Sequence, residues 1–202
     1  GIIIGLDTDT PDTADRILEF IRLSNIPMLT INLLYALPKT PLWRRLEKEN
    51  RLVFDQKRES NVEFLMPYDR VVEMWRRCIT NAYDPEFLYQ RFAYNVEHTY
   101  PNRFKVPNSP QRASWSNIRK GLILLANILL RIGVFGRYRE TFWKMAKPAL
   151  KAGKIESVIH VGMVAHHLIE FTRQCAEGEE SASFYSQKVR QPQFSEIKVG
   201  SH

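Results

Sequence analysis

Cysteine is nearly absent from this chain of 202 residues, and its scarcity excludes several kinds of site. Only Cys78 and Cys175 occur. A disulfide framework, a cysteine-ligated zinc site and an iron–sulfur cluster each need more thiols than these two positions supply. We therefore expect two buried or half-buried thiols in a reducing environment, and no metal centre within the chain.

Long apolar runs and an N-terminal signal peptide are also missing. No apolar stretch reaches the roughly 18 residues that a membrane-spanning helix needs. With 44% hydrophobic and 25% charged residues, the composition is typical of a folded globular chain rather than a disordered one. These features predict a cytoplasmic protein with a packed core.

Acidic residues are almost absent from one segment of the chain. Residues 112–154 contain ten Lys or Arg and a single acid, Glu140, whereas residues 1–111 contain equal numbers of acidic and basic side chains. The net charge of +7 therefore comes from this segment. Such a block indicates either an anionic partner, with acidic lipid favoured over nucleic acid, or a solvated face.

The centre of the basic segment is apolar. Residues 122–130 read LILLANILL and are too short to span a bilayer core of about 30 Å. Flanking cations and nearby aromatic residues are typical of a helix that lies on an anionic membrane. The segment thus supports one functional hypothesis, a non-catalytic helical module that binds anionic lipid through residues 112–154 at the inner membrane. A buried core helix with a solvated basic face is the alternative, and the pattern leaves both open.

Two short apolar runs near the start of the chain predict a pair of strands. Residues 1–6 and 28–34 are rich in Ile and Leu, and a helical pattern lies between them, with Thr10 as the expected N-cap and Pro11 at the first helical position. A strand–helix–strand unit with short joints places its strands in parallel. We therefore expect the residues that follow the two strands to lie at the same edge of the sheet.

Ligands of parallel α/β sheets bind beyond the carboxyl ends of the strands. In this chain those ends are marked by Asp7 and Tyr35, and Gly5 would let a ligand approach the backbone closely. An alternative explanation is that Asp9 and Thr10 only cap the following helix.

The remainder of the chain predicts helices. Thr40 followed by Pro41, and Asp84 followed by Pro85, are typical helix starts, and from Tyr68 onward the apolar spacing is helical. The fold class expected is mostly α with a small α/β part. The expected domains are residues 1–55 and a helical domain over residues 56–202, with a short last helix at residues 181–191.

The runs GIIIGLD and ALPKTPLWRRLEKE resemble the cobalamin-binding branch of the radical SAM superfamily. Gly1, Ile3 and Gly5 match the GxIxGxxE pattern of that superfamily's fifth strand, whereas Thr8 stands where the pattern has Glu. The resemblance implies that residues 1–55 are the last βαβα of a partial (βα)6 barrel, followed by an all-helical C-terminal domain. It also implies a set of residues on the adenine side of S-adenosylmethionine: Ile3, Gly5, Asp7, Leu34 and Tyr35.

Within that branch, the runs NVEFLMPYDRVVEMWRRCI and GMVAHHLIEF most resemble hopanoid C-2 methyltransferases. The resemblance implies methylation of an unactivated carbon of a hydrophobic substrate, a membrane triterpenoid. The implied cofactors are a 4Fe-4S cluster, S-adenosylmethionine and cobalamin. Ligands for the cluster and for cobalamin are expected to precede Gly1, so the chain alone is expected to be inactive and names no catalytic residue.

Overall fold

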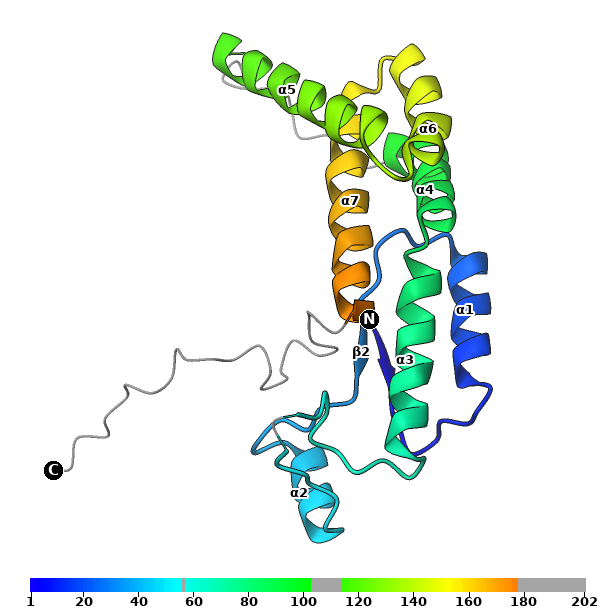
Figure 1. Ribbon diagram of the computed structural model, residues 1–202, viewed down its shortest axis with the longest axis vertical. Helices are drawn as coiled ribbons and strands as arrows, with labels where there is room; N and C mark the ends of the chain where they lie inside the picture. The colour runs from blue at the N-terminus through cyan, green and yellow to red at the C-terminus, as the bar shows by residue number, and fades with distance from the viewer. Residues whose placement is uncertain (56, 103–113, 178–202) are drawn as a thin grey trace, which may run out of the picture. The chain divides into compact units, whose positions relative to one another are not determined.

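The computed structural model describes residues 1–55, 57–102 and 114–177. Its contacts divide the chain into two units, and Figure 1 labels the α-helices and β2. Among the described residues, unit 1 comprises residues 1–17, 29–80 and 173–177. Unit 2 comprises residues 18–28 and 81–172.

A two-stranded parallel sheet forms the α/β part of unit 1. Strand β1 (Ile2–Ile4) pairs with β2 (Ile31–Leu33), and α1 (Thr13–Ser24) lies between them in the chain. The register places Ile2 opposite Ile31. The predicted parallel pairing with a crossover helix is therefore confirmed, although both strands are shorter than expected.

The start of α1 differs from the prediction. The helix begins at Thr13, and the Asp12 carbonyl accepts from the Arg16 N–H at 3.2 Å, as the residue before a helix does. Thr10 and Pro11 belong to the preceding turn, in which the Thr10 N–H donates to Oγ1 of Thr13 at 2.9 Å. The expected N-cap at Thr10 is wrong because its hydroxyl donates to the Asp12 carboxylate instead.

One face of the sheet is covered. Ile4, Ile31 and Leu33 point to this face and are all buried. Trp75 of α3 (Tyr68–Ala82) donates its indole N–H to the Ile31 carbonyl at 2.8 Å, which fixes the helix against β2. Burial of aliphatic side chains under a helix is the usual source of stability for such a layer.

The opposite face of the sheet is open. Side chains alternate along a strand, so the register partners Ile3 and Asn32 share this face. Ile3 is 51% exposed and Asn32 is half-buried. Parallel strands are normally covered on both faces, so this exposed face is unusual for such a sheet.

Helix α2 (Pro41–Lys48) follows the second strand. As predicted, Thr40 is its N-cap, accepting the Trp43 N–H at 3.2 Å, and Pro41 opens the first turn. Beyond the helix an isolated antiparallel bridge joins Leu52 and Val62. The bridge pairs the residues just after α2 with those that precede α3.

The described part of unit 2 is helical. Helix α4 (Pro85–Tyr94) continues as η1 (Asn95–Thr99) and η2 (Tyr100–Asn102). Helix α5 (Trp115–Ile128) continues as η3 (Leu129–Val134). Two further helices follow, α6 (Arg139–Lys151) and α7 (Ile155–Glu177). The largest fully buried side chains of this unit are Tyr89, Phe92 and Phe142. The last helix runs into unit 1 at Arg173.

The expected fold class is confirmed as mostly helical with a small parallel sheet. Asp84 caps α4 as predicted, accepting the Glu86 N–H at 3.0 Å. The helix expected at residues 181–191 lies outside the described residues. Over the described part of the chain, no helix has the length and apolarity required to cross a membrane. The (βα)6 barrel and the domain limits at residues 55 and 56 remain predictions.

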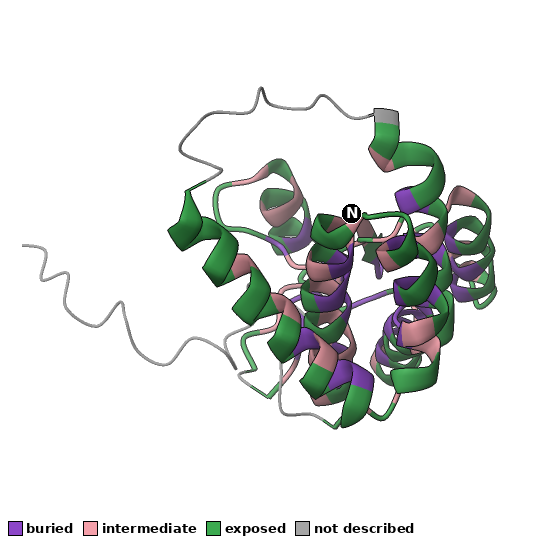
Figure 2. Cartoon of the chain, turned by 90° about the horizontal axis from the view of Figure 1, so that it is seen from above, coloured by how far each residue is buried: buried purple, intermediate pink, exposed green. Residues whose placement is uncertain are grey.

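Residues 122–130 do not form a buried core helix. Within this stretch only Ile128 is buried, whereas Leu122, Ile123 and Leu130 are exposed. Figure 2 shows α5 largely in the colour of exposed residues. The core-helix alternative is therefore wrong for the described residues, because the rest of unit 2 covers only one narrow side of α5.

Candidate functional site

The carboxyl ends of the two strands meet at one edge of the sheet. Pairing continues one step beyond β2, where the Leu34 N–H donates to the Ile4 carbonyl at 2.8 Å. The first strand then turns away at Gly5, whose φ of +103° lies in the left-handed region. A Cβ at this position would lie 2.5 Å from Cε1 of Phe64. Both the backbone conformation and the Phe64 ring therefore require glycine here.

Asp9 closes the turn that follows the first strand. Its Oδ2 accepts the Gly5 N–H at 2.7 Å and the Leu6 N–H at 3.0 Å. The carboxylate therefore satisfies the strand end and does not cap α1. Because these two N–H groups already have a partner within the chain, a ligand at this edge would meet side chains rather than these donors.

Two arginines hold Asp7 at the same edge. Oδ1 of Asp7 accepts from Nη2 of Arg51 at 2.7 Å, and Oδ2 accepts from Nη2 of Arg45 at 2.8 Å. Arg51 also pairs with Glu49 at 2.9 Å and donates Nε to the Glu63 carbonyl at 2.9 Å. The cluster thus joins the end of the first strand to α2 and to the segment that follows it.

The electrostatics of this cluster favour its charged form. The hydrogen bond from Arg51 holds the pKa of Asp7 below its ordinary value, and the pair in turn raises the pKa of Arg51. Arg51 is the less exposed of the two arginines, so its pair with Asp7 is less screened by solvent. Asp7 therefore remains ionised, and its role here is to position the surrounding segments.

Ser60 and Asn61 extend the edge of the second strand with their side chains. Oδ1 of Asn61 accepts the Ala36 N–H at 2.8 Å, and Nδ2 donates to the Ala36 carbonyl at 2.8 Å. Oγ of Ser60 donates to the Leu34 carbonyl at 2.5 Å. Both side chains are buried. They satisfy backbone groups that a neighbouring strand would otherwise pair.

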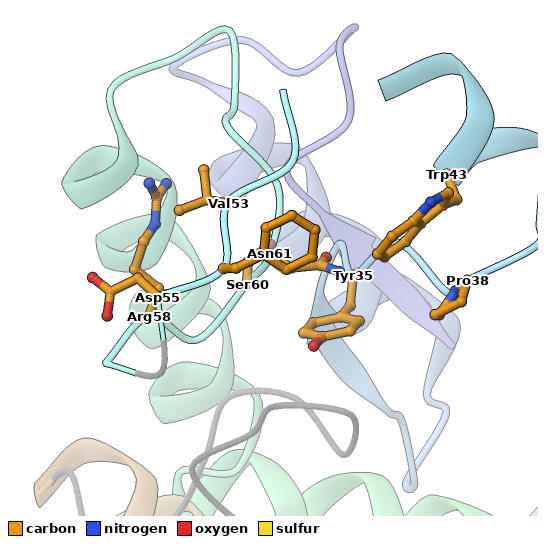
Figure 3. Close-up of a pocket in the computed structure, with 9 residues that line it drawn as sticks. Tyr35, Pro38, Trp43, Val53, Asp55, Arg58, Ser60 and Asn61 are labelled. Atoms are coloured by element: carbon orange, nitrogen blue, oxygen red, sulfur yellow. The ribbon is translucent and has the colours of Figure 1, made fainter. Parts of the chain in front are cut away.

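A small cavity lies beside this pair. Figure 3 shows Pro38 and Trp43 at one end and Asp55 and Arg58 at the other, with Tyr35 between them. The cavity measures about 90 Å³. Sites for drug-sized ligands are typically roughly 300–1,000 Å³, so this cavity can take a few waters or a small ion but not a nucleoside cofactor.

Arg58 is the cationic residue that lines the cavity, and Asp55 is the anionic one. Nη1 of Arg58 pairs with Glu63 at 2.6 Å, and its guanidinium lies 4.1 Å from the centre of the Tyr68 ring. Its Nε is buried and lacks a hydrogen-bond partner among the described residues. A buried donor of this kind is normally satisfied by water or by a ligand.

The structure places the residues predicted for the adenine side in different settings. Ile3 lies on the open sheet face, Gly5 is covered by Phe64, and Asp7 is held by two arginines. Leu34 is buried, whereas Tyr35 is half-buried and lines the cavity. Of the five residues, Ile3 has the exposed side chain and Tyr35 is the one that lines the cavity.

Sequence reasoning missed several residues that build this edge: Trp43, Arg51, Arg58, Ser60 and Asn61. Their positions depend on contacts across the fold; the bonds between Asn61 and Ala36 span 25 residues, for example. The available signal was weak. Ser60 and Asn61 directly precede an apolar stretch, but in sequence such a polar pair resembles any turn.

The two cysteines are structural. Both are buried thiols, and Sγ of Cys78 lies 3.9 Å from the Ala14 carbonyl. Burial raises the pKa of Cys78 to about 11, which makes the thiolate rare at neutral pH. Over the described residues, no group of three His, Cys, Asp or Glu side chains is placed to hold a metal ion.

Comparison with known families identifies the chain. The family described as Domain of unknown function (DUF4070) matches residues 40–181, which make up most of the chain. The chain belongs to this family. The match of the DUF4070 family begins at Thr40, the N-cap of α2, and includes the cavity walls from Trp43 to Asn61.

Two curated proteins are similar to this DUF4070 chain. The hopanoid C-2 methylase of Rhodopseudomonas palustris (strain TIE-1) is 52% identical over 191 residues, or 95% of the chain and 36% of that protein. An uncharacterised methyltransferase of a Synechocystis species is 29% identical over 183 residues, or 85% of the chain and 32% of that protein. The chain thus spans about a third of the length of the curated relatives it matches. No solved structure gives a significant match. The resemblance to hopanoid C-2 methyltransferases is confirmed.

Proposed function

We propose that the chain is the C-terminal part of a cobalamin-dependent radical SAM methyltransferase that methylates an unactivated carbon of a hopanoid. The observation that carries this proposal is the 52% identity, over 95% of the chain, to a protein named hopanoid C-2 methylase. The second relative is also named a methyltransferase. Both names support an enzyme as the parent protein and methyl transfer as its reaction.

The open sheet face supports a place for residues 1–55 within a larger parallel sheet. Two parallel strands alone are marginal in water, and the face that carries Ile3 and Asn32 has little cover. In a partial (βα)6 barrel such a face would look into the barrel, where ligands bind near the strand ends. We therefore assign residues 1–55 to the end of the barrel and residues 56–202 to the appended helical domain.

The residues of this chain fit the proposed cofactors unequally. Cys78 and Cys175 are the two thiols of the chain and both are buried, so they do not supply the three cysteines that a cluster usually needs. No step is therefore assigned to this chain through the cluster or through cobalamin. For S-adenosylmethionine, the exposed side chain of Ile3 and the half-buried ring of Tyr35 fit an apolar contact with adenine. S-adenosylmethionine supplies the radical that activates the substrate in this class of reaction.

The other residues of the edge would support that contact. Gly5 keeps the strand end close to Phe64, and Asp9 holds the turn through the Gly5 N–H. The ion pairs of Asp7 keep α2 in place beside the strand end. Their proposed role is to position the adenine-side surface and to exclude water from it.

The test begins with the coding DNA upstream of this chain. We expect the same reading frame to contain a CxxxCxxC motif and a cobalamin-binding domain. The protein expressed from the longer frame, with its cofactors reconstituted without oxygen, should methylate a hopanoid in a mass-spectrometric assay, and the 202-residue chain should not. A longer frame without clustered cysteines, or methylation by the chain alone, would contradict the proposal.

A matched pair of variants tests the adenine-side surface. Ile3→Ala in the longer protein should raise the KM for S-adenosylmethionine several-fold, because a partly exposed apolar contact is lost. Ile155→Ala, on α7 and similarly exposed, should leave the KM unchanged. Equal values for the two variants would remove Ile3 from the binding surface.

A non-catalytic lipid-binding module was the alternative drawn from the charge pattern. The high identity to a named methylase favours the enzyme as the main function. The exposure of α5 nevertheless agrees with contact between the basic segment and lipid. Lipid contact and methyl transfer are compatible properties of one protein.

A further inference from the structure

The outer side of α5 and its continuation η3 carries large apolar side chains that face solvent. Its main members, 51–80% exposed, are Trp115, Leu122, Ile123, Leu130 and Phe135, and we call this surface the α5 face. Trp115 and Leu122 are about two helical turns apart, as are Ile123 and Leu130, and Leu122 and Ile123 are adjacent, so these four side chains share one broad side of the helix. Few soluble proteins leave a row of this kind uncovered without a binding role.

The unit itself leaves the α5 face uncovered. The main neighbour of α5 is η3, its own continuation. Only the opposite side of the helix is packed, where Ile128 lies so close to α7 that a Cβ on Gly162 would be 2.6 Å from its Cγ2. Helix α5 is therefore anchored near its C-terminal end, and its outer side is available to a partner.

Positive charge flanks the α5 face. Residues 115–135 contain no Asp or Glu, and Arg119, Lys120 and Arg131 are all exposed. Two other cations of the basic segment are already used within the unit. Lys144 pairs with Glu86 at 3.8 Å, and Lys154 donates to the Val96 carbonyl at 3.1 Å.

A groove lies on the packed side of α5, next to Ile128. It measures about 280 Å³ and is lined by α5, η3 and α7. Ile128, Ile132 and Met163 contribute apolar walls, and Arg131 and His166 contribute polar groups. A groove with apolar walls and a cation at its border matches the two ends of a phospholipid, an acyl chain and a phosphate.

We infer that the α5 face docks the protein on an anionic phospholipid membrane, with α5 lying in the plane of the interface. The apolar side chains would enter the acyl boundary while Arg119, Lys120 and Arg131 contact lipid phosphates. Exposed aromatic rings at both ends, Trp115 and Phe135, suit the boundary between headgroups and acyl chains. With 14 residues, α5 is too short to span a bilayer.

Charge argues for lipid rather than a second copy of the chain on this surface. Two copies that met through the α5 face would bring like charges together at its border. An anionic bilayer instead neutralises those cations. Docking does not depend on methyl transfer, although it would also bring the protein to a membrane-borne triterpenoid.

Vesicle flotation with the purified 202-residue chain tests this docking. The chain should float with vesicles of equal parts phosphatidylglycerol and phosphatidylcholine, and not with phosphatidylcholine alone. Binding should fall several-fold when salt rises from about 0.05 M to about 0.5 M, because salt screens the cations. Failure to float with the anionic vesicles at low salt would overturn the inference.

Two matched pairs of variants locate the surface. Ile123→Glu with Leu130→Glu should weaken vesicle binding about tenfold or more, because two inserted apolar groups become charged. Phe20→Glu with Leu23→Glu, on similarly exposed positions of α1, should bind within about twofold of the unchanged chain. Arg119→Glu with Arg131→Glu should abolish the preference for anionic vesicles, whereas Arg44→Glu with Arg76→Glu should preserve it.

Other occupants would produce different results. If analytical ultracentrifugation shows a dimer that Ile123→Glu with Leu130→Glu converts to monomer, and these substitutions leave vesicle binding unchanged, a second copy covers the α5 face and membrane docking is wrong. Circular dichroism of each variant confirms that the helices are retained. Flotation needs no cofactor, so a failed methylation assay leaves the result standing, and failed flotation leaves the methyltransferase proposal standing.

Discussion

Asp7 and Arg51, 44 residues apart in the chain, form an ion pair with Oδ1 and Nη2 separated by 2.7 Å. The pair joins the end of the first strand to the segment that follows α2. Arg51 also binds the carbonyl of Glu63, so three stretches of unit 1 meet at one guanidinium. The shape of the candidate site therefore depends on a contact that no local pattern specifies.

Removing the charge of Asp7 should destabilise unit 1. Asp7→Asn leaves Arg51 without its main partner, and we expect the free energy of unfolding at pH 7 to fall by about 1–3 kcal/mol. The pair with Arg45 adds less because that arginine is about half exposed. Urea titration measures the change, with Glu47→Gln on the exposed side of α2 as the control.

The effect of Asp7→Asn should depend on pH. The pKa of Asp7 in the folded chain lies below its ordinary value of 3.8. Its stabilisation is therefore fully present above that value and is lost as the pH falls through the lowered pKa. The difference between the unchanged chain and the variant should shrink below about pH 4. A difference that stays constant down to the acid transition would show that the ion pair contributes nothing.

Glycine 5 and glycine 121 should respond to alanine with opposite signs. Gly5→Ala places a Cβ against Phe64 at a positive φ, and we expect it to destabilise the chain by about 1–3 kcal/mol. Gly121 lies inside α5 with nothing within 4 Å of an added Cβ. There alanine should stabilise by roughly 0.5–1 kcal/mol through helix propensity. Thermal unfolding of both variants checks the contrast.

The side-chain amide of Asn61 is predicted to contribute strongly to the stability of the folded chain, although the side chain is small. Asn61→Ala removes both hydrogen bonds to Ala36 from a buried position and should lower the free energy of unfolding by about 2 kcal/mol or more. Asn61→Asp keeps the acceptor but turns an oxygen toward the Ala36 carbonyl, which raises the pKa of the new carboxyl in the folded state. The aspartate variant should therefore lose stability as the pH rises above about 4, whereas the alanine variant should not. Urea midpoints of both variants at pH 4 and pH 7 measure the difference. An equal change in the midpoint of both variants between the two pH values would contradict this prediction.

Cys78 should be chemically inert in the folded chain. Its pKa of about 11, raised by burial from 9.0, lowers the thiolate population at pH 8 roughly a hundredfold. Iodoacetamide followed by peptide mass spectrometry should modify Cys78 slowly in the native chain and rapidly in urea. Fast labelling without urea would show that the position opens to solvent.

The chain by itself should not take up an iron–sulfur cluster. The chain has only two thiols, both buried, and a 4Fe-4S cluster usually needs at least three clustered cysteines. Reconstitution with iron and sulfide in the absence of oxygen, followed by iron analysis, should give far less than one cluster per chain. The longer protein serves as the positive control. A stoichiometric cluster on the chain would overturn the expectation that its ligands lie elsewhere.

Local features of this fold could be predicted from the sequence, whereas contacts between residues far apart in the chain could not. Thr40 and Asp84 were identified as N-caps because the capping side chain and the N–H that it accepts lie within three residues. The same reasoning failed at Thr10, where Asp12 competes for the hydroxyl. Ser60 and Asn61 escaped prediction because their partners lie about 25 residues away.

The sequence by itself determined the parallel strand pair, the helical character after Tyr68, the basic segment and the resemblance to hopanoid methyltransferases. The first three follow from periodicity, capping and composition, which act over a few residues, and the resemblance rests on the matching sequence runs themselves. Only the tertiary structure decided which polar groups close the sheet edge and which side of α5 remains exposed. Burial and pairing between distant segments depend on how the helices pack, and the same apolar run can be a core helix or a surface one until that packing is known.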